Sequence, residues 1–197
     1  NSASLIIGDP SDGAAADIVR YSQNQQILSL ADIFINRTGV LDLNNFTDDV
    51  GDVSMVAGTI DTGTGTLQLR GNLTAIGDAF DLTFYNALIL GNLDLGSTAR
   101  TFTVNNNPFA SGIGTDLEID AAVTVGSGTW TKNGAGEMAL THSNSSTGPL
   151  IIRDGRLIVT DSNALGGTAN GLIISNTANL ELSGDLTITG KALTLDT

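Results

Sequence analysis

The sequence predicts an all-β protein built as a β-solenoid, in which short strands stack coil upon coil. Three observations predict this fold class. Apolar and polar residues alternate in short runs, which is the period of a strand with one buried face. Gly, Asn, Asp and Ser separate these runs, and these residues permit tight turns. The apolar residues are mostly Leu, Ile, Val and Ala, and only 5% of the chain is aromatic, which suits a narrow interior filled in layers.

The composition limits the classes of partner. The 197 residues carry a formal net charge of −13, which disfavours binding to nucleic acid or to anionic membrane surfaces. The chain has no cysteine, so disulfides and thiolate metal sites are ruled out. It has no apolar run long enough to span a bilayer, so no membrane insertion of this segment is expected. Cations, cationic partners or simple solubility remain as roles for the charge.

The first quarter of the chain contains short strands and one ambiguous segment. A strand is expected at residues 4–8, followed by a turn at 9–13. Residues 17–30 fit either a short helix or a strand, a turn and a second strand. We favour the strands, because Asn24, Gln25 and Gln26 interrupt the helical spacing. Further strands are expected at 33–35, 40–43 and 53–56, the last after an acidic loop at 44–52.

From Gly58 onward the turn residues recur regularly. Strands of this length are too short for an ordinary sandwich and suit the faces of a stacked coil. The loop at 105–114, centred on Pro108, is the expected protrusion. Near the C-terminal end, strands begin at intervals of six to eight residues, so three faces give a coil of about twenty residues and about nine coils in the chain. The strands expected in this part are at 58–60, 65–69, 71–74, 81–84, 87–90, 91–95, 101–104, 117–119, 123–125, 172–174, 180–182, 186–188 and 193–195.

Residues 128–166 carry the most specific pattern in the chain. Its parts are Trp130-Thr131-Lys132, Gly134-Ala135-Gly136, Met138–Thr141, the polar tract Ser143–Gly148, Leu150–Ile152, Gly155–Val159 and Asn163–Gly166. This pattern resembles the passenger-associated transport repeat, also called the autotransporter-associated β-strand repeat, of bacterial surface and secreted proteins. The resemblance implies a right-handed parallel β-helix in a secreted or surface-displayed bacterial protein, and a repeat associated with efficient export. It implies no reaction.

The ends of the chain are expected to be joints. We interpret residues 1–197 as one β-solenoid module, a fragment or one period of a longer repetitive protein. The strands at both ends lack a polar cap, so neighbouring repeats or identical copies are expected to stack there. The expected function is a non-enzymatic structural module. The alternatives are a self-assembling extracellular filament subunit or adhesin, and a β-helix enzyme that acts on polysaccharide. The predicted joint residues are Leu5, Ile6, Ile7, Leu193 and Leu195.

Two acidic groups are candidates for metal binding. Asp48, Asp49 and Asp52 offer oxygen ligands of the kind that Ca²⁺ prefers, as do the acids of the turn at 9–13, but neither has the ligand spacing of an EF-hand. The second group is Asp116, Glu118 and Asp120, which are expected to share one outward strand face. Acidic trios on the face of a β-helix can bind calcium or cleave polysaccharide. We expect solvated acids in both places and no cofactor, with calcium binding as the alternative.

The remaining candidates point to structure. His142 lies near Ser143, Ser145 and Ser146, but no nucleophile elbow supports a triad, and we expect a polar turn and assign no catalytic residue. Trp130, the sole tryptophan, is expected to pack in the core or over a corner. The Asn-rich turns at 44–45 and 105–107 are expected to stack as amide ladders between coils.

Overall fold

The computed structural model describes residues 3–9, 17–80, 83–107, 114–175 and 177–196. The turn expected at 9–13 and the centre of the loop expected at 105–114 fall outside these residues. The described part of the chain is made of strands, turns and bends. It contains no helix that is both long and apolar enough to cross a membrane.

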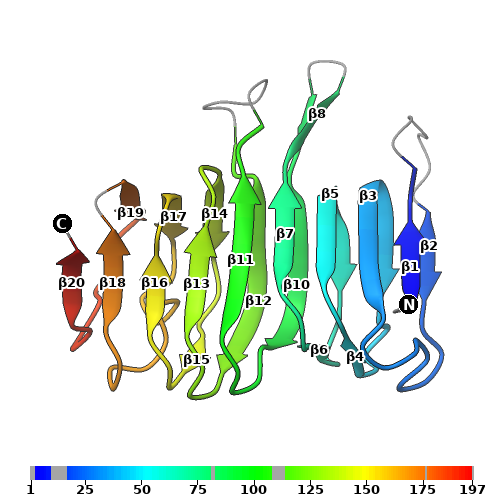
Figure 1. Ribbon diagram of the computed structural model, residues 1–197, viewed down its shortest axis with the longest axis horizontal. Helices are drawn as coiled ribbons and strands as arrows, with labels where there is room; N and C mark the ends of the chain where they lie inside the picture. Colours follow the sequence, from blue (N-terminus) through cyan, green and yellow to red (C-terminus); the bar gives the residue numbers. More distant parts are fainter. Residues whose placement is uncertain (1–2, 10–16, 81–82, 108–113, 176, 197) are drawn as a thin grey trace.

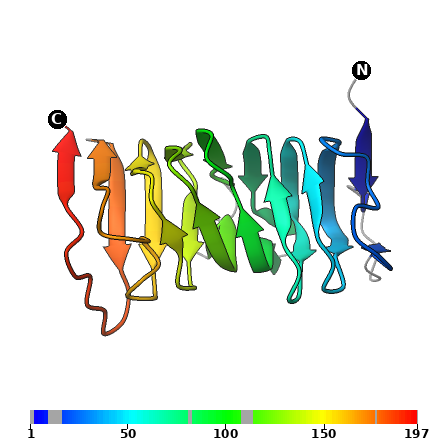
Figure 2. The ribbon, with the colours of Figure 1, turned by 90° about the horizontal axis from the view of Figure 1, so that it is seen from below.

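The strands wind into a right-handed parallel β-helix with three faces, which confirms the predicted fold class (Figure 1). In that view the chain rises along the nearer face, face A, descends along face B behind it and returns through face C below. Each turn of the helix moves from the N-terminus on the right towards the C-terminus on the left. Seen from below in Figure 2, the coils lie side by side along one rod.

Face A extends through every coil of the described chain. Its strands pair in parallel from β1 to β20, and their number confirms the prediction of about nine coils. The strands of face A are β1 (Ser4–Ile7), the first parts of β3 (Asp32–Asp42) and β5 (Val53–Asp61), β7 (Leu73–Ile76), β11 (Arg100–Asn105), β13 (Trp130–Asn133), β16 (Leu150–Ile152), β18 (Leu172–Ser175) and β20 (Leu193–Asp196).

Faces B and C complete the coil. Face B comprises β2 (Ile18–Arg20), the second parts of β3 and β5, the first parts of β10 (Ala87–Asp94) and β12 (Leu117–Val125), β14 (Glu137–Leu140), β17 (Gly155–Val159) and β19 (Ala178–Leu182). Face C is shorter and comprises β4 (Asp48–Val50), β6 (Leu67–Leu69), the second parts of β10 and β12, and β15 (Ser145–Ser146).

The coil has the predicted length of about twenty residues except where insertions occur. The register partners Val53 and Leu73 mark one such regular coil. The next coil, from Leu73 to its partner Phe102, is longer because it carries an antiparallel hairpin of β8 (Asp78–Phe80) and β9 (Thr83–Tyr85). Figure 1 shows the hairpin projecting from the top of the rod. The coil strand predicted at 81–84 is therefore wrong for residues 83–84, which lie in this hairpin, and 81–82 fall outside the described residues.

The interior consists of columns of aliphatic side chains, one from each coil. Alternation along each strand points every second residue inward, so register partners stack along the rod. One column on face B contains Leu41, Ile60, Ile89, Ile119 and Leu140, and all five side chains are fully buried. Layers of similar aliphatic residues let each coil use the previous one as its packing surface.

Other segments also differ from expectation. Residues 17–30 form a strand only at β2, and the rest is irregular because its amides bond to side chains and carbonyls of the next coil. The polar tract at 143–148, which has the composition of a turn, contributes β15 to face C, where the Ser146 side chain is buried. Residues 186–188 form no strand, although Leu186 and Ile188 still pack against the core.

Candidate functional site

The first coil presents one edge of the sheet. Leu5 and Ile7 of β1 point inward, and Ile7 is buried, whereas Ile6 points outward and is 65% exposed. Beside Ile6, the outward side chain of its register partner Phe34 is also exposed. The predicted joint residues at this end therefore divide into two inward residues and one that belongs to the outer surface of face A.

The last coil presents the opposite edge. Leu193 and Leu195 occupy inward positions of β20 in register with Leu172 and Ile174, yet they are 55% and 66% exposed because no described strand lies beyond them. Leu193 also lines an apolar cavity of about 170 Å³. The cavity is lined by Leu165, Leu172, Leu180, Leu182, Ile188, Lys191 and Leu193.

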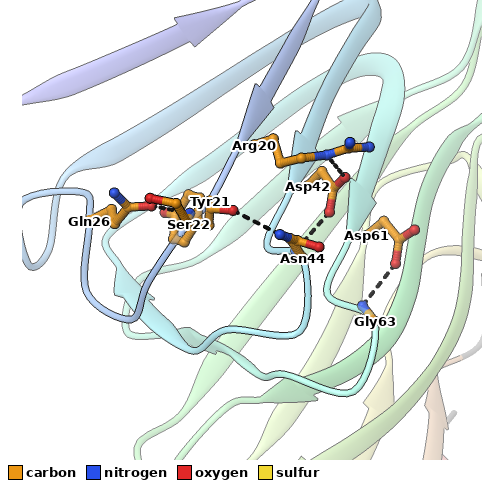
Figure 3. Close-up of polar contacts among 8 residues, drawn as sticks. All are labelled: Arg20, Tyr21, Ser22, Gln26, Asp42, Asn44, Asp61 and Gly63. Atoms are coloured by element: carbon orange, nitrogen blue, oxygen red, sulfur yellow. Dashed lines mark hydrogen bonds and ion pairs between the residues drawn. The ribbon is translucent and has the colours of Figure 1, made fainter.

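The first corner between faces B and C is held by polar contacts that repeat from coil to coil (Figure 3). The Arg20 guanidinium lies 2.6 Å from Asp42 on the next coil. Asp42 also accepts a hydrogen bond from the Asn44 amide at 2.7 Å, and Asp61, its register partner, accepts one from the Gly63 amide at 2.9 Å. These carboxylates serve as turn-forming groups.

The candidate calcium ligands do not converge. Asp48 points inward and is fully buried, where it accepts hydrogen bonds from the amides of Ile27 and Asp49. Burial first, and then the neighbouring Asp48, raise the pKa of Tyr21 above its ordinary value. Among the described residues, no three acidic, His or Cys side chains lie close enough together to hold a metal ion. Calcium binding by Asp48, Asp49 and Asp52 stays an untested alternative.

The other two acids bind neighbouring coils. Asp49 accepts a hydrogen bond from the Ser29 hydroxyl at 2.5 Å. Asp52 accepts one from the amide of Asn72 at 2.7 Å, and Asn72 in turn accepts one from the amide of Thr101 at 2.9 Å. Asn and Asp side chains thus bridge successive coils, but in these contacts they bond mainly to backbone groups. The expected ladder of stacked amides at Asn44 is likewise replaced by a bond from its side chain to the Tyr21 carbonyl.

The predicted outward trio of acids is wrong at one position. Asp116 precedes β12 at a corner and is 2% exposed, because its carboxylate accepts hydrogen bonds from three backbone amides. Glu118 and Asp120 do lie on the outer surface, where they bond to Asn86 and Thr141. The acidic face that a polysaccharide-cleaving site would need is therefore not formed by these three residues.

His142 lies on the surface. Its Nδ1 is 3.3 Å from the Ser143 carbonyl oxygen, whereas the buried Ser146 hydroxyl donates to the Gly148 carbonyl. The His142 ring and the Ser146 hydroxyl thus contact different carbonyl groups, as expected for a polar turn.

Trp130 lies in the core, as expected. Its ring meets Phe102 of the previous coil edge to face, with centroids 5.3 Å apart and planes at 73°. Its indole N–H is buried and has no hydrogen-bond partner among the described residues.

The sequence pattern was not used to predict one notable buried residue, a lysine. Lys132 occupies the inward column of face A between Phe102 and Ile152 and is fully buried. Its ammonium donates to the carbonyl oxygens of Gly134 at 2.5 Å, Gly136 at 2.6 Å and Asp154 at 2.7 Å. Burial lowers the pKa of Lys132 to about 8, against the opposing effect of nearby carboxylates.

A signal for this burial was present in the sequence. In Trp130-Thr131-Lys132 the period of two that points Trp130 inward also points Lys132 inward. Lys191, the other lysine, uses its ammonium similarly, donating to the Leu165 and Gly167 carbonyls at 2.8 and 2.9 Å. Both lysines of the chain thus bind the backbone of turns.

These features define a right-handed β-solenoid whose corners are held by side-chain bonds between coils. Comparison with known proteins identifies the repeat within it. Residues 131–159 match the model of the passenger-associated-transport-repeat, so the chain carries this repeat and the resemblance seen in the sequence is confirmed. No solved structure matches the chain.

One curated relative extends the match beyond the repeat. Over 132 residues, 66% of this chain, the sequence is 33% identical to the Adhesin BmaC autotransporter of Brucella suis biovar 1 (strain 1330). The chain spans 4% of that relative's length. The matched relative is thus much longer than this solenoid.

Proposed function

We propose that this chain is a non-enzymatic structural section of a secreted or cell-surface bacterial passenger protein. The observation that carries the proposal is the unbroken parallel pairing of face A from β1 to β20, which makes the molecule a rod that is continuous from edge to edge. The transport repeat at 131–159 and the autotransporter relative support the surface location. The side chains considered for catalysis or calcium binding bond to the backbone or to neighbouring side chains, as structural groups do.

The repeat has a second proposed role in export. A solenoid can fold coil by coil, because each coil contacts only its neighbours. A repeat that forms a stable coil outside the membrane would then draw the chain outward. The buried polar contacts of coil 6, which begins at β13, join it to the coils before and after it, through Asp116 on one side and the Asp154 carbonyl on the other.

The experiment compares two deletions of equal length in the parent protein displayed on bacteria. Deleting residues 53–72 removes one coil in register, because Val53 pairs with Leu73, and deleting 130–149 does the same, because Trp130 pairs with Leu150. Each deletion therefore leaves the inward and outward positions of the remaining strands unchanged. We expect the first deletion to leave surface display unchanged and the second to reduce it, measured by antibody labelling of intact cells.

An out-of-register control completes the design. Deleting 53–62 joins a face A position to a face C position and should abolish display by disrupting the stack. Equal display of the 53–72 and 130–149 deletions would contradict the export role alone. Loss of display with every in-register deletion would contradict the structural role.

A second candidate function is self-assembly into filaments through the two edges. The observation that favours it is the exposure of Leu193 and Leu195 at inward positions. A strand edge with exposed apolar residues is a template for pairing with a further coil or a second copy of the chain.

A further inference from the structure

One peptide group of coil 6 lies between two buried side chains of opposite charge. The carbonyl of Gly136 accepts a hydrogen bond from the Lys132 ammonium at 2.6 Å. The amide of the same peptide group, carried by Glu137, donates to the Asp116 carboxylate at 2.9 Å. Lys132 is fully buried and Asp116 is 2% exposed. The Lys132 ammonium and the Asp116 carboxylate therefore bind opposite sides of the same peptide group.

Both side chains also bind neighbouring coils. Asp116 accepts hydrogen bonds from the amides of Gly77, in the coil of β7, and Asn107, in the coil of β11, at 3.4 and 3.1 Å. Asn107 closes the contact by donating its side-chain amide to the Gly77 carbonyl at 2.9 Å. On the other side, Lys132 reaches the Asp154 carbonyl in the coil of β16. The two charges thus bind backbone groups of four consecutive coils.

The backbone groups that bind Asp116 lie in two coils that are longer than the regular ones. Gly77 immediately precedes the hairpin β8–β9, and Asn107 follows β11 in the long connection from Asn105 to Leu117 of β12. The register partners Leu73, Phe102 and Lys132 show that both coils are longer than the regular ones, so their ends must be brought together across longer segments. Asp116 binds the backbone at the start of both insertions.

The intervening peptide group leaves no room for a side chain at Gly136. A Cβ there would lie 2.8 Å from the Asp116 carboxylate and 2.7 Å from the backbone of Asn105. The close approach of the backbone to Asp116 therefore depends on glycine. In such a buried setting a hydrogen bond to a charged group strengthens the next bond along the chain of donors and acceptors.

We propose that Asp116, the Gly136–Glu137 peptide group and Lys132 act as one unit, the corner clasp, that fixes the register of the coils on both sides of these two insertions. Each charge compensates the other through the shared peptide group. Removing either one leaves the opposite charge buried with weakened partners, which is the costly state. The inference does not depend on export or surface display.

A double-mutant cycle tests the coupling in the 197-residue chain. Asp116→Asn and Lys132→Met are close in size to the native residues, and each should raise the equilibrium constant for unfolding about 100-fold, measured by urea titration. The equilibrium constant for unfolding of the double variant should be lower, by about tenfold or more, than the product of the two single effects predicts. If the effect of the double variant equals that product within about twofold, the proposal is overturned, because independent contacts are additive in free energy.

Lys191 supplies the matched control. Its ammonium also binds two backbone carbonyls, but it contacts neither Asp116 nor the Gly136–Glu137 peptide group in the described structure. Asp116→Asn combined with Lys191→Met should therefore be additive. Coupling as large as in the first cycle would show a general loss of cooperativity and would also overturn the proposal.

Hydrogen exchange gives a local readout. Lys132→Met should speed exchange of the Glu137 amide about tenfold relative to the Thr141 amide of the same coil, which bonds to the Ile119 carbonyl. Lys191→Met should not change this ratio. Where Lys132→Met does not fold, Lys132→Gln, which keeps two N–H donors, replaces it. An unchanged ratio in the folded Lys132 variant would contradict transmission through the peptide group.

Discussion

Lys132 is a charged residue in a column where the adjoining coils place Phe102 and Ile152. An ammonium at such a position loses its hydration and is tolerated only because three carbonyl oxygens replace the water. The site therefore exchanges hydrophobic packing for a fixed set of hydrogen bonds between two turns. Its titration should be visible in the stability of the protein.

We expect the free energy of unfolding to rise as the pH increases from about 8. The pKa of Lys132 is about 8 in the folded protein and its ordinary value is 10.5, so between these values only the unfolded state retains the proton. Stability rises with pH wherever the unfolded state binds more protons, by up to about 1.4 kcal/mol per pH unit for one group. Burial also lowers the pKa of Lys191, so this group adds to the rise of the free energy of unfolding with pH.

Deprotonation of Tyr21 in the unfolded state ends the rise of the free energy of unfolding at high pH. Its pKa is raised on folding, so above its ordinary value of 10.0 the unfolded state loses a proton that the folded state keeps, and stability falls. Urea titrations from pH 7 to 11 should show a maximum near pH 10. Lys132→Met should remove most of the rise while leaving the fall, and an unchanged profile in that variant would contradict the assignment to Lys132.

Gly155 should be intolerant of a side chain. Its φ is +66°, and a Cβ there would lie 2.5 Å from the Gly136 carbonyl oxygen and from the Lys132 ammonium. Gly155→Ala should cost about 2–4 kcal/mol, from backbone strain and the displaced contact together. Gly184→Ala is the control, since φ is +99° there but no atom lies within 4 Å, and it should cost only about 1 kcal/mol. Equal losses by thermal unfolding would show that sterics contribute nothing.

At this scale the sequence predicts which way a side chain points better than what it contacts. Alternation places Trp130 and Lys132 inward, and both are buried. The burial of Asp116 was not predictable in this way, because one of its donors, Gly77, lies 39 residues away and reaches it only when the coils stack in register. For the same reason the bond between Asp52 and Asn72 follows from the coil length and is not visible in either segment alone.

The hairpin β8–β9 is a separate element attached to the coil. Its two strands pair only with each other in the described structure and form a two-stranded sheet apart from the large one. The base of the hairpin is fixed by the ion pair of Arg37 and Asp78, at 2.5 Å, and by the bonds to Gly77. The solenoid is therefore expected to persist without it.

Removing the hairpin should leave the rod folded. Deleting residues 78–85 reduces the spacing of Leu73 and Phe102 to that of the register partners Ile174 and Leu195. We expect an unchanged far-ultraviolet circular dichroism spectrum and a loss of about 1 kcal/mol or less, owing to the lost ion pair. Arg37→Ala in the intact chain measures that part separately. Loss of the cooperative transition would show that the hairpin is needed for the coil.

Strand positions were predicted well where aliphatic residues alternate and less well where polar residues form the face. Leu172–Ser175 and Leu193–Asp196 lie where the alternation placed them. Ser145–Ser146 has the composition of a turn, which predicts a loop, yet backbone pairing with Thr124 and Val125 makes it a strand. The alternating triplet at 186–188 remains irregular, although its apolar residues are partly buried.

The whole molecule is a stack of coils, and in the described structure the coil of β1 and the coil of β20 each pair with one other coil. Leu193 and Leu195 remain exposed for that reason, as does the inward Leu182 of β19. The predicted joint residues Leu193 and Leu195 thus occupy core positions that the described chain leaves uncovered at the C-terminal edge.

Charging this edge should prevent association of the chain with itself. The double change Leu193→Asp and Leu195→Asp should abolish concentration-dependent growth in light scattering. It should cost less than about 1 kcal/mol of stability, because both side chains are already exposed. Thr194→Asp, between them on the same strand, is the control and should leave association intact. A wild-type chain that stays monomeric at high concentration would contradict self-assembly.

Trp130 makes the junction between the coils of β11 and β13 directly observable. It is the sole tryptophan of the chain and its ring is packed against Phe102, away from water. Its fluorescence should be blue-shifted in the folded protein and should move to longer wavelength when that junction opens. The protein therefore contains an intrinsic optical probe at the start of its transport repeat, and the order in which this region and the rest of the rod form can be followed without a label.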